Sequence, residues 1–426
     1  MNKILNRILN YSPKFRGELR KLYSMYRYFF SDKIKSEGNI KCVSPDDGLE
    51  YFFGYYDKSP WNKDGSCMLC LRAKNTWKYP ASEAPADIVL IDTSSNSVKK
   101  IATTHCWNVQ QGCMLQWLGP NFDTEIIFND FRNGRLCAII LDVFTGKERL
   151  LNMPVYAVAS DGSFALSLDF SRLHRLRPGY GYLNVPDLTS KESLPNGTCV
   201  WKIDLKTGEE RGLLQYRDFF DFEHRADFEG AVHGVNHIMI SPNNRRFMIL
   251  HRWFENGKID QLHKKTRLVT CDVDGTNMYN LNDDGMVSHC YWRDDEHILS
   301  FEKKREVVGY FLMKDKTHEY TNCWPELNNT GRINNDGHPS YSPDKTMVIT
   351  DTYPDFQRMA RLLLIVNPDS QDYEIQPIAR VFHPFRYDND TRCDLHPRWS
   401  RDGSQICFDG VFEGRRRLYV VNLNNK

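Results

Sequence analysis

Polar and apolar positions along most of the chain follow the pattern of short β-strands. From about residue 40 onward, short apolar runs alternate with polar turns rich in Asp, Asn, Gly and Pro. Examples are the runs CMLCLRA, SFALSLD and SQICFDG, each of which directly follows such a turn. Strand-length runs separated by tight Asp-Gly-type turns are typical of antiparallel sheets. The pattern therefore predicts an all-β fold.

The turns form an internal repeat. An aromatic or apolar residue followed by a Ser-x-Asp-Gly-like turn recurs at intervals of about 40 to 60 residues, with one longer step. The seven turns lie at Ser59, Trp117, Val158, Ile240, Tyr291, Tyr341 and Trp399. This spacing is that of four-stranded propeller blades, and a single blade cannot bury both of its faces. The sequence predicts one seven-bladed β-propeller over residues 40–426.

The longer step lies between Val158 and Ile240 and predicts an insertion at roughly 169–232. The insertion is rich in Arg, Phe, Asp and Glu, which suits a lid over a central channel. The turn motif itself resembles the TolB-like propeller repeats, in which a similar turn opens each blade. That resemblance covers nearly all of residues 40–426 and implies the architecture rather than an activity.

Residues 1–39 predict a basic amphipathic helical arm, with the helix over 1–36. Ser12 can cap the helix and Pro13 fits its first position. Apolar residues recur at helical spacing at Phe15, Leu19, Leu22, Tyr23, Tyr26, Phe29 and Phe30, and the other face carries Lys14, Arg16, Arg20, Lys21 and Arg27. Such a helix can lie on an anionic membrane surface or can dock on the propeller and bury its stripe. We favour docking.

Composition narrows the partners and the compartment. The chain has 56 basic and 55 acidic residues, so no global field indicates a nucleic-acid partner. Its twelve cysteines stand mostly in strand-like runs, and the Cys67/Cys70 pair has no second pair to complete a zinc site. Free thiols, the absence of a signal-peptide core and the absence of a long apolar span predict a cytoplasmic protein, with peripheral membrane contact through residues 1–36 as an additional possibility.

Histidines stand at equivalent places in several repeats. His237, His338 and His396 each precede a blade turn, and His289 lies two residues before the turn that starts with Tyr291 and Trp292. The innermost strands of a propeller converge on its channel, and neutral imidazoles brought together there can hold a metal ion. The alternative is that histidine is a structural feature of the repeat. We favour the metal site.

Other polar residues accompany these histidines. They are Tyr56 and Asp57, His251 and Arg252, Asp351, Tyr353 and Asp355, and Arg392 and Asp394. Buried charges are costly unless they are paired, so their number predicts a ligand site. Arginine in such a site suits a carboxylate or a phosphate, because its fork binds two oxygens at once.

At these residues the sequence resembles the oligogalacturonate lyases, which are cytoplasmic seven-bladed propellers that use a divalent metal. The resemblance implies that His237, in HIMISP, is the catalytic base and that His289 is a metal ligand. A Gln-x-x-His-x-His ligand pattern of that family corresponds here to Asn335, His338 and Ser340, so only one ligand histidine is kept. The family's arginine corresponds to Arg225, in FEHRADFEG.

The resemblance implies β-elimination from a uronic-acid residue in an acidic oligo- or polysaccharide. His237 would act as base with Arg252 and Arg225, and His289, His338, His396 and Asn335 would hold a divalent metal, manganese in preference to zinc. Substrate would be bound by Tyr56, Asp57, Tyr353, Arg392 and Asp394. Two alternatives stay open: a hydrolase or transferase on an acidic glycan, which would use Asp57, Asp351 and Asp394, and a non-catalytic propeller that binds glycan or protein.

Overall fold

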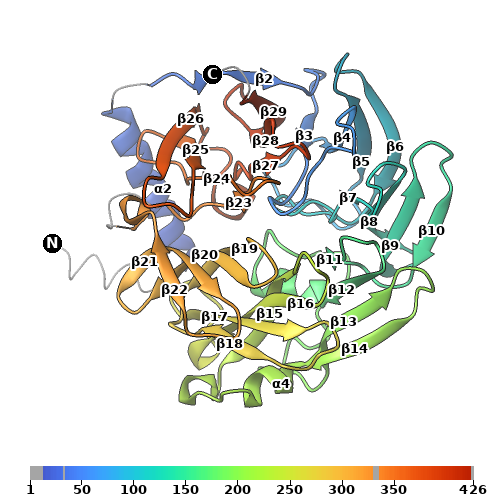
Figure 1. Ribbon diagram of the computed structural model, residues 1–426, viewed down its shortest axis with the longest axis vertical. Coiled ribbons are helices and arrows are strands. Elements are labelled where there is room, and N and C mark those ends of the chain that lie inside the picture. Colours follow the sequence, from blue (N-terminus) through green and yellow to red (C-terminus); the bar gives the residue numbers. More distant parts are fainter. Residues whose placement is uncertain (1–12, 32–33, 330–334, 424–426) are drawn as a thin grey trace.

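The computed structural model describes residues 13–31, 34–329 and 335–423. Seven antiparallel sheets, six of four strands and one of five, surround a central axis, which confirms the predicted seven-bladed β-propeller (Figure 1). The first three blades, each from its innermost to its outermost strand, are β3 (Glu50–Phe52), β4 (Cys67–Ala73), β5 (Ala86–Asp92) and β6 (Val98–Thr104); β7 (Gln116–Trp117), β8 (Glu125–Arg132), β9 (Arg135–Asp142) and β10 (Glu148–Leu151); and β11 (Ala157–Val158), β12 (Phe164–Leu168), β13 (Thr198–Asp204) and β14 (Glu210–Gln215).

The next three blades continue in chain order around the ring. They are β15 (Val232–Ile240), β16 (Arg246–Phe254), β17 (Lys264–Asp272) and β18 (Tyr279–Asn282); β19 (Val287–Trp292), β20 (His297–Lys304), β21 (Val307–Lys314) and β22 (Tyr320–Cys323); and β23 (Ser340–Tyr341), β24 (Met347–Asp351), β25 (Met359–Val366) and β26 (Glu374–Phe382).

The seventh blade joins the two ends of the chain. Its inner strands are β27 (Arg398–Trp399), β28 (Gln405–Gly410) and β29 (Arg417–Asn422), and its outermost strand is β2 (Ile40–Cys42). Ile40 pairs with Val421, and Cys42 pairs with Tyr419. The short strand β1 (Glu37–Gly38) pairs with the outer edge of β26. The segment that follows the arm therefore closes the ring.

Side-chain hydrogen bonds explain the repeated turn. The motif lies between the first and second strands of a blade, and in two of the blades its Ser and Asp side chains form a hydrogen bond within the turn. The Ser342 hydroxyl donates to Asp344 at 2.6 Å, and the Ser400 hydroxyl donates to Asp402 at 2.6 Å. Such local side-chain bonds fix a tight turn. The blades pack through buried apolar side chains, and all twelve cysteines are free, ten of them buried.

The insertion is smaller than predicted and is split in two. Residues 198–215, which lie within the predicted 169–232 segment, form β13 and β14 and are regular strands of the third blade. The extra elements are α3 (Phe170–Leu176), in the connection from β12 to β13, and α4 (Tyr216–Asp221) with a 3₁₀ turn (Ala226–Phe228), between β14 and β15. The long spacing between the turns at Val158 and Ile240 comes from two separate insertions, one before β13 and one after β14. For this reason the two strands were not recognised in the sequence.

The arm forms the helix α2 (Pro13–Phe29), with Pro13 at its first residue as predicted, while Ser12 lies outside the described residues. The expectation that docking buries its apolar stripe is wrong: Leu22, Tyr26 and Phe30 are 59%, 61% and 71% exposed. Tyr28 packs against Phe382 and Phe385 of the sixth blade, with ring centroids 5.7 and 5.5 Å away. Among the described residues, no helix is long and apolar enough to cross a membrane.

Candidate metal and catalytic site

Irregularities in two innermost strands reorient histidines. The register of β15 shifts between Asn236 and Met239, and His237 within the shift has a φ of 58°. The register of β19 shifts between Val287 and Cys290, which flank His289. A bulge of this kind turns a side chain away from the regular alternation of a strand. The backbone amide of His237, outside the regular ladder, donates to the Tyr156 hydroxyl at 3.1 Å.

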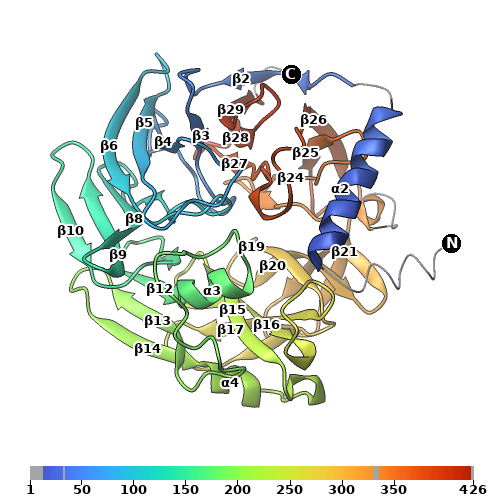
Figure 2. The ribbon, with the colours of Figure 1, turned by 180° about the vertical axis from the view of Figure 1, so that it is seen from behind.

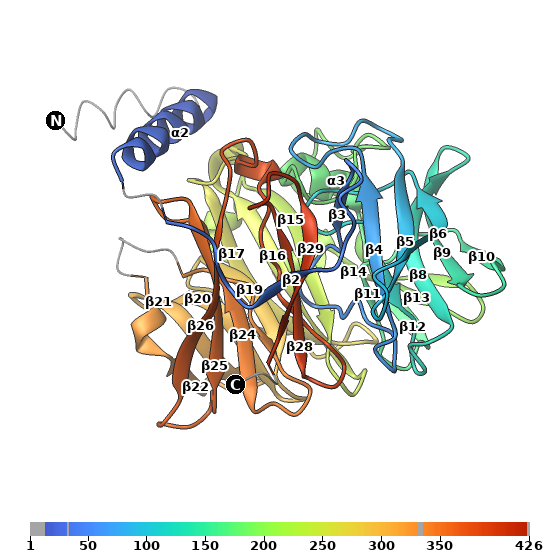
Figure 3. The same cartoon turned by 90° about the horizontal axis from the view of Figure 1, so that it is seen from above.

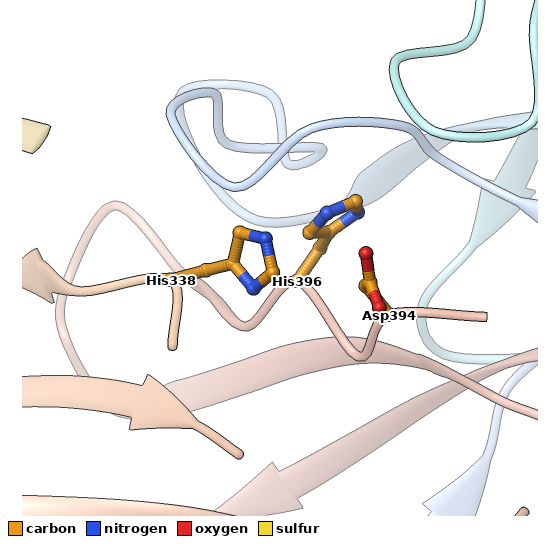
Figure 4. Close-up of side chains that lie close together, drawn as sticks. All are labelled: His338, Asp394 and His396. Atoms are coloured by element: carbon orange, nitrogen blue, oxygen red, sulfur yellow. The ribbon is translucent and has the colours of Figure 1, made fainter. Parts of the chain in front are cut away.

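Three of the predicted histidines come together. The ring centroids of His289 and His338 are 3.9 Å apart, and those of His338 and His396 are 4.3 Å apart. All three side chains are buried. They come from three successive blades, and Figure 4 shows His338 and His396 beside the carboxylate of Asp394. Potential ligand atoms of His338, Asp394 and His396 lie within 4.8 Å of one another.

Each of the three imidazoles uses its Nδ1 atom for a hydrogen bond. Nδ1 of His338 lies 2.8 Å from Oδ1 of Asp351, Nδ1 of His289 lies 3.0 Å from Oδ1 of Asp336, and Nδ1 of His396 lies 2.9 Å from the carbonyl of Gly54. Carbonyl oxygens and ionised carboxylates only accept, so Nδ1 carries the proton in each ring. The lone pair of each neutral imidazole is therefore on Nε2.

Burial favours the neutral imidazole at His289 and His396. Burial, followed by the neighbouring His338, lowers the pKa of His289 to about 4, and burial lowers the pKa of His396 well below its ordinary value. Although burial opposes ionisation, the adjacent His338 leaves the pKa of Asp351 below its usual range. Neutral imidazoles beside ionised carboxylates are the forms in which these side chains bind metal ions.

The donor atoms of the cluster suit a divalent cation. Nε2 of His338 and Nε2 of His396 are buried and have no hydrogen-bond partner among the described residues. Imidazole nitrogens accompanied by a carboxylate oxygen are donors that both manganese and zinc accept. The carboxylate of Asp394 also binds the Arg392 guanidinium, with two N–O distances of 2.8 Å. An ion held here would share this carboxylate with Arg392.

His237 lies next to the cluster, between two tyrosines. Its Nε2 atom is 3.3 Å from both the Tyr56 hydroxyl and the Cys290 carbonyl, and its Nδ1 atom is 3.3 Å from the Tyr55 hydroxyl. The carbonyl can only accept, so Nε2 carries the proton and Nδ1 holds the lone pair. Burial, with His289 nearby, lowers the pKa of His237 well below its ordinary value. His237 is therefore a neutral imidazole with an available basic nitrogen.

Cationic side chains line a pocket on one side of His237. The pocket is bounded by α3, β15, β16 and the start of β17, and Arg177, Arg252 and Lys264 lie in its wall. Arg252 is buried, and its Nε donates to Asn236, the neighbour of His237, at 2.7 Å. Burial, followed by the nearby charge of Arg177, lowers the pKa of Arg252 to about 9. In the described part of the chain, none of the three cations forms an ion pair with a carboxylate.

The loop after α3 covers this region. Tyr180 lies edge-on to Tyr55, with ring centroids 6.4 Å apart, and its hydroxyl accepts a hydrogen bond from Arg177. Gly181 has a φ of 67°, and a Cβ atom there would lie 2.3 Å from the carbonyl oxygen of Phe170. Glycine is therefore required for the loop to fold back onto α3. This part of the insertion lies over the site, where a lid was expected.

The other predicted residues differ in their placement. Tyr353 lies near both Arg392 and His338, with the Arg392 guanidinium 5.2 Å from its ring centre. Asp57 binds the neighbouring Lys58 at 2.7 Å. The Asn335 amide donates to the Leu327 carbonyl, and the adjacent Asp336 is the residue that contacts His289.

Arg225 lies apart from the base that it was expected to assist. It binds Asp227 and Asp283 at 2.9 and 3.0 Å and lies over the Trp253 ring. These contacts join the insertion to the loop after β18, and no contact of Arg225 with His237 occurs among the described residues. Arg252 and Arg177 are the guanidinium groups near His237.

Several residues of the site escaped the sequence analysis. Tyr55 precedes Tyr56 in the same motif, and only the fold distinguishes their directions. Asp336 follows Asn335, which the family pattern drew attention to instead. Arg177 and Lys264 occupy no recurring position in the repeat, so no pattern in one sequence could have identified them.

The fold and the site together define a class of protein: a seven-bladed propeller with a buried cluster of three histidines at its axis. No protein-family model matches the chain, and no curated protein matches it. Among solved structures, it is similar to an oligogalacturonate lyase in complex with manganese, at 16% identity and a TM-score of 0.62, covering 92% of this chain and 96% of that one. It is similar to the oligogalacturonate lyase of Vibrio parahaemolyticus, at 14% identity and a TM-score of 0.59, covering 92% and 98%. TolB from Acinetobacter baumannii matches at 13% identity and a TM-score of 0.41, covering 74% and 66%. At these identities the likeness concerns the fold.

Proposed function

We propose that the protein is a metal-assisted lyase that cleaves uronic-acid-containing oligo- or polysaccharides by β-elimination. The observation on which this rests is the pairing of two features. The first is the set of His338 and His396 with Nε2 lone pairs beside the Asp394 carboxylate, with the His289 ring against His338. The second is a neutral His237 next to this cluster. The manganese complex of a lyase with the same fold supports the choice of reaction and favours manganese over zinc.

His289, His338, His396 and Asp394 would hold the cation. When bound, a divalent cation would neutralise the substrate carboxylate and make the adjacent C–H more acidic. The buried Nε2 atoms without partners support this assignment for His338 and His396. The ring of His289 lies against that of His338 and has the same Nδ1-bound arrangement.

His237 would receive the proton. Its Nδ1 lone pair accepts from the Tyr55 hydroxyl, and burial keeps the Tyr55 pKa well above its ordinary value, so Tyr55 is protonated. As the substrate C–H bond breaks, the Tyr55 oxygen takes that proton while its own proton moves to Nδ1. The electron pair of the C–H bond forms the new C=C bond, and the β C–O bond breaks with its electrons on the leaving oxygen.

The cationic pocket supports an acidic substrate. Arg177, Arg252 and Lys264 lie close to His237 without a carboxylate partner among the described residues. Unpaired cations in a partly buried pocket are costly unless an anion joins them. A carboxylate group of an acidic substrate would supply that charge.

The carboxylate-based hydrolase has less support. The three acids that it would use are already engaged: Asp57 with Lys58, Asp351 with His338 and Asp394 with Arg392. A general acid needs a raised pKa, whereas the pKa of Asp351 is lowered by His338.

The test is incubation of the purified protein with uronate oligosaccharides and Mn²⁺, followed by the ultraviolet absorbance of the unsaturated product. We expect activity that chelation removes and Mn²⁺ restores. His237→Gln should lower it by at least about a hundredfold. His263→Gln is the matched control, since His263 lies in a surface turn bound to Asp260. Absence of product from every uronate oligosaccharide in the presence of Mn²⁺ would contradict the proposal.

A further inference from the structure

The helix α2 exposes a concentrated apolar stripe. Of the sixteen large apolar side chains that are exposed among the described residues, six fall within residues 22–30. They are Leu22, Tyr23, Met25, Tyr26, Phe29 and Phe30, with exposed fractions from 44% to 74%. Single exposed apolar side chains are ordinary, but a contiguous group of this kind marks an interaction surface.

Attachment to the propeller fixes which side of α2 faces outward. Tyr28 packs on Phe382 and Phe385, and the Arg27 guanidinium lies over the Phe356 ring at 4.9 Å. At about 100° per residue, Tyr28 is about 160° around the helix from both Tyr26 and Phe30. Tyr28 therefore faces the sixth blade, while Tyr26 and Phe30 point away from it.

Charge separates the arm from the rest of the molecule. Residues 1–36 contain nine basic and two acidic residues, a net charge of +7. The other 390 residues contain 47 basic and 53 acidic residues, a net charge of −6. Along the chain, Lys21 directly precedes the apolar stripe and Arg27 lies within it. Basic residues beside an aromatic and aliphatic stripe are the pattern that binds the interface of an anionic bilayer.

We propose that α2 docks the protein on the surface of an anionic membrane, with the stripe inserted at the level of the lipid headgroups. Charge complementarity favours this occupant over a second copy of the chain, because pairing two arms would bring two +7 segments together. This inference does not depend on the proposed reaction.

The position of α2 has a consequence for orientation. Figures 2 and 3 show α2 and α3 at the same end of the propeller, with α2 beside the sixth blade. The helix α3 borders the cationic pocket near His237. Membrane docking through α2 would bring that end of the propeller towards the lipid surface.

The test is co-sedimentation of the full-length protein with vesicles of phosphatidylcholine alone or mixed with phosphatidylglycerol. We expect at least about tenfold stronger partitioning onto the anionic vesicles, reduced by high salt. The triple variant Leu22→Ser, Tyr26→Ser, Phe30→Ser should lose at least about tenfold in partitioning. The matched control Phe144→Ser, Leu188→Ser, Leu262→Ser removes three other exposed apolar side chains and should bind like the wild type.

Two results would overturn the inference. One is wild-type protein that sediments with neither kind of vesicle. The other is equal partitioning of the wild type and the triple serine variant, with both shown to be folded by circular dichroism. If sedimentation velocity reveals a dimer that only the α2 variant dissolves, and vesicles are not bound, the stripe is an interface between copies and the membrane proposal fails.

Discussion

Asp351 binds two histidines of the cluster at once. Its Oδ1 atom lies 2.8 Å from Nδ1 of His338 and accepts the backbone N–H of His338 at 2.8 Å, and its Oδ2 atom accepts the backbone N–H of His396 at 3.1 Å. One buried carboxylate thus fixes the ring orientation of His338 and the backbone position of His396. Mutation of a residue that orients metal ligands in this way typically costs about 10- to 100-fold in metal affinity.

Asp351→Asn should therefore weaken metal binding while leaving every proposed ligand in place. We expect a loss of about 10- to 100-fold in Mn²⁺ affinity, measured by isothermal titration calorimetry. Asp344→Asn is the control, because Asp344 lies in the exposed turn of the same blade, bound to Ser342 and Thr346. Unchanged affinity in Asp351→Asn would show that Asp351 does not orient the ligands.

Tyr55→Phe tests the proton relay. The variant keeps the aromatic packing against His396 and His237 but removes the hydroxyl bonded to Nδ1 of His237. We expect kcat for uronate oligosaccharides to fall by about 10²-fold or more with little change in KM and in bound metal. An undiminished kcat would exclude Tyr55 from the proton path.

Lys264→Met tests the anion pocket. Lys264 lines the pocket with Arg177 and Arg252. Removal of its charge should therefore weaken the binding of acidic oligosaccharides by roughly tenfold. The loss should appear in KM and should diminish at high salt, since charge attraction is screened. Lys258→Met, at the exposed turn after β16, is the control. Equal KM values for the two variants would remove Lys264 from the substrate site.

The stability of the protein should fall as the pH drops below about 6.5, and one histidine pair explains part of this loss. Nδ1 of His251 accepts a hydrogen bond from Arg267, and Nε2 of His251 lies 3.0 Å from Nδ1 of His233. Nε2 of His233 in turn lies 3.1 Å from the Phe228 carbonyl oxygen. Every ring nitrogen is thus satisfied only when both imidazoles are neutral. Burial lowers the pKa of His233 to about 4, from an unfolded value of about 6.5.

The folded state binds fewer protons than the unfolded state between these two values, so stability is complete above pH 6.5 and is lost as the pH falls towards 4. Between pH 7.5 and 5, His233 should contribute about 2 kcal/mol of this loss. Between pH 7.5 and 5, the free energy of unfolding measured with urea should therefore fall by about 2 kcal/mol less for His233→Phe than for the wild type. Val232→Ala should lower stability equally at both pH values, and a wild-type pH dependence in His233→Phe would contradict the assignment.

The sequence predicts the architecture well because the repeat has a local physical cause. A turn joins the first two strands of each blade, so the turn count equals the blade count, and the side chains within it form a Ser–Asp bond at Ser342 and at Ser400 and a Ser–Asn bond at Ser241. The histidines are found for the same reason, since His237, His338 and His396 occupy matching places in their repeats.

What the sequence could not supply are contacts between distant segments. Asp336 and Gly54 orient His289 and His396 from other parts of the ring, and Arg177 reaches the site from an insertion without any repeat. The burial of the α2 stripe was predicted wrongly because an amphipathic pattern is the same whether its apolar face meets protein or another phase. Only tertiary placement separates the two cases.

The central claim is the metal site, and the most direct test is elemental analysis of the purified protein beside the double variant His338→Ala, His396→Ala. The account predicts near-stoichiometric manganese or zinc after dialysis against the metal, lost in the double variant while circular dichroism shows the propeller intact. Equal metal content in the parent and the variant, or none in either after loading, would contradict it.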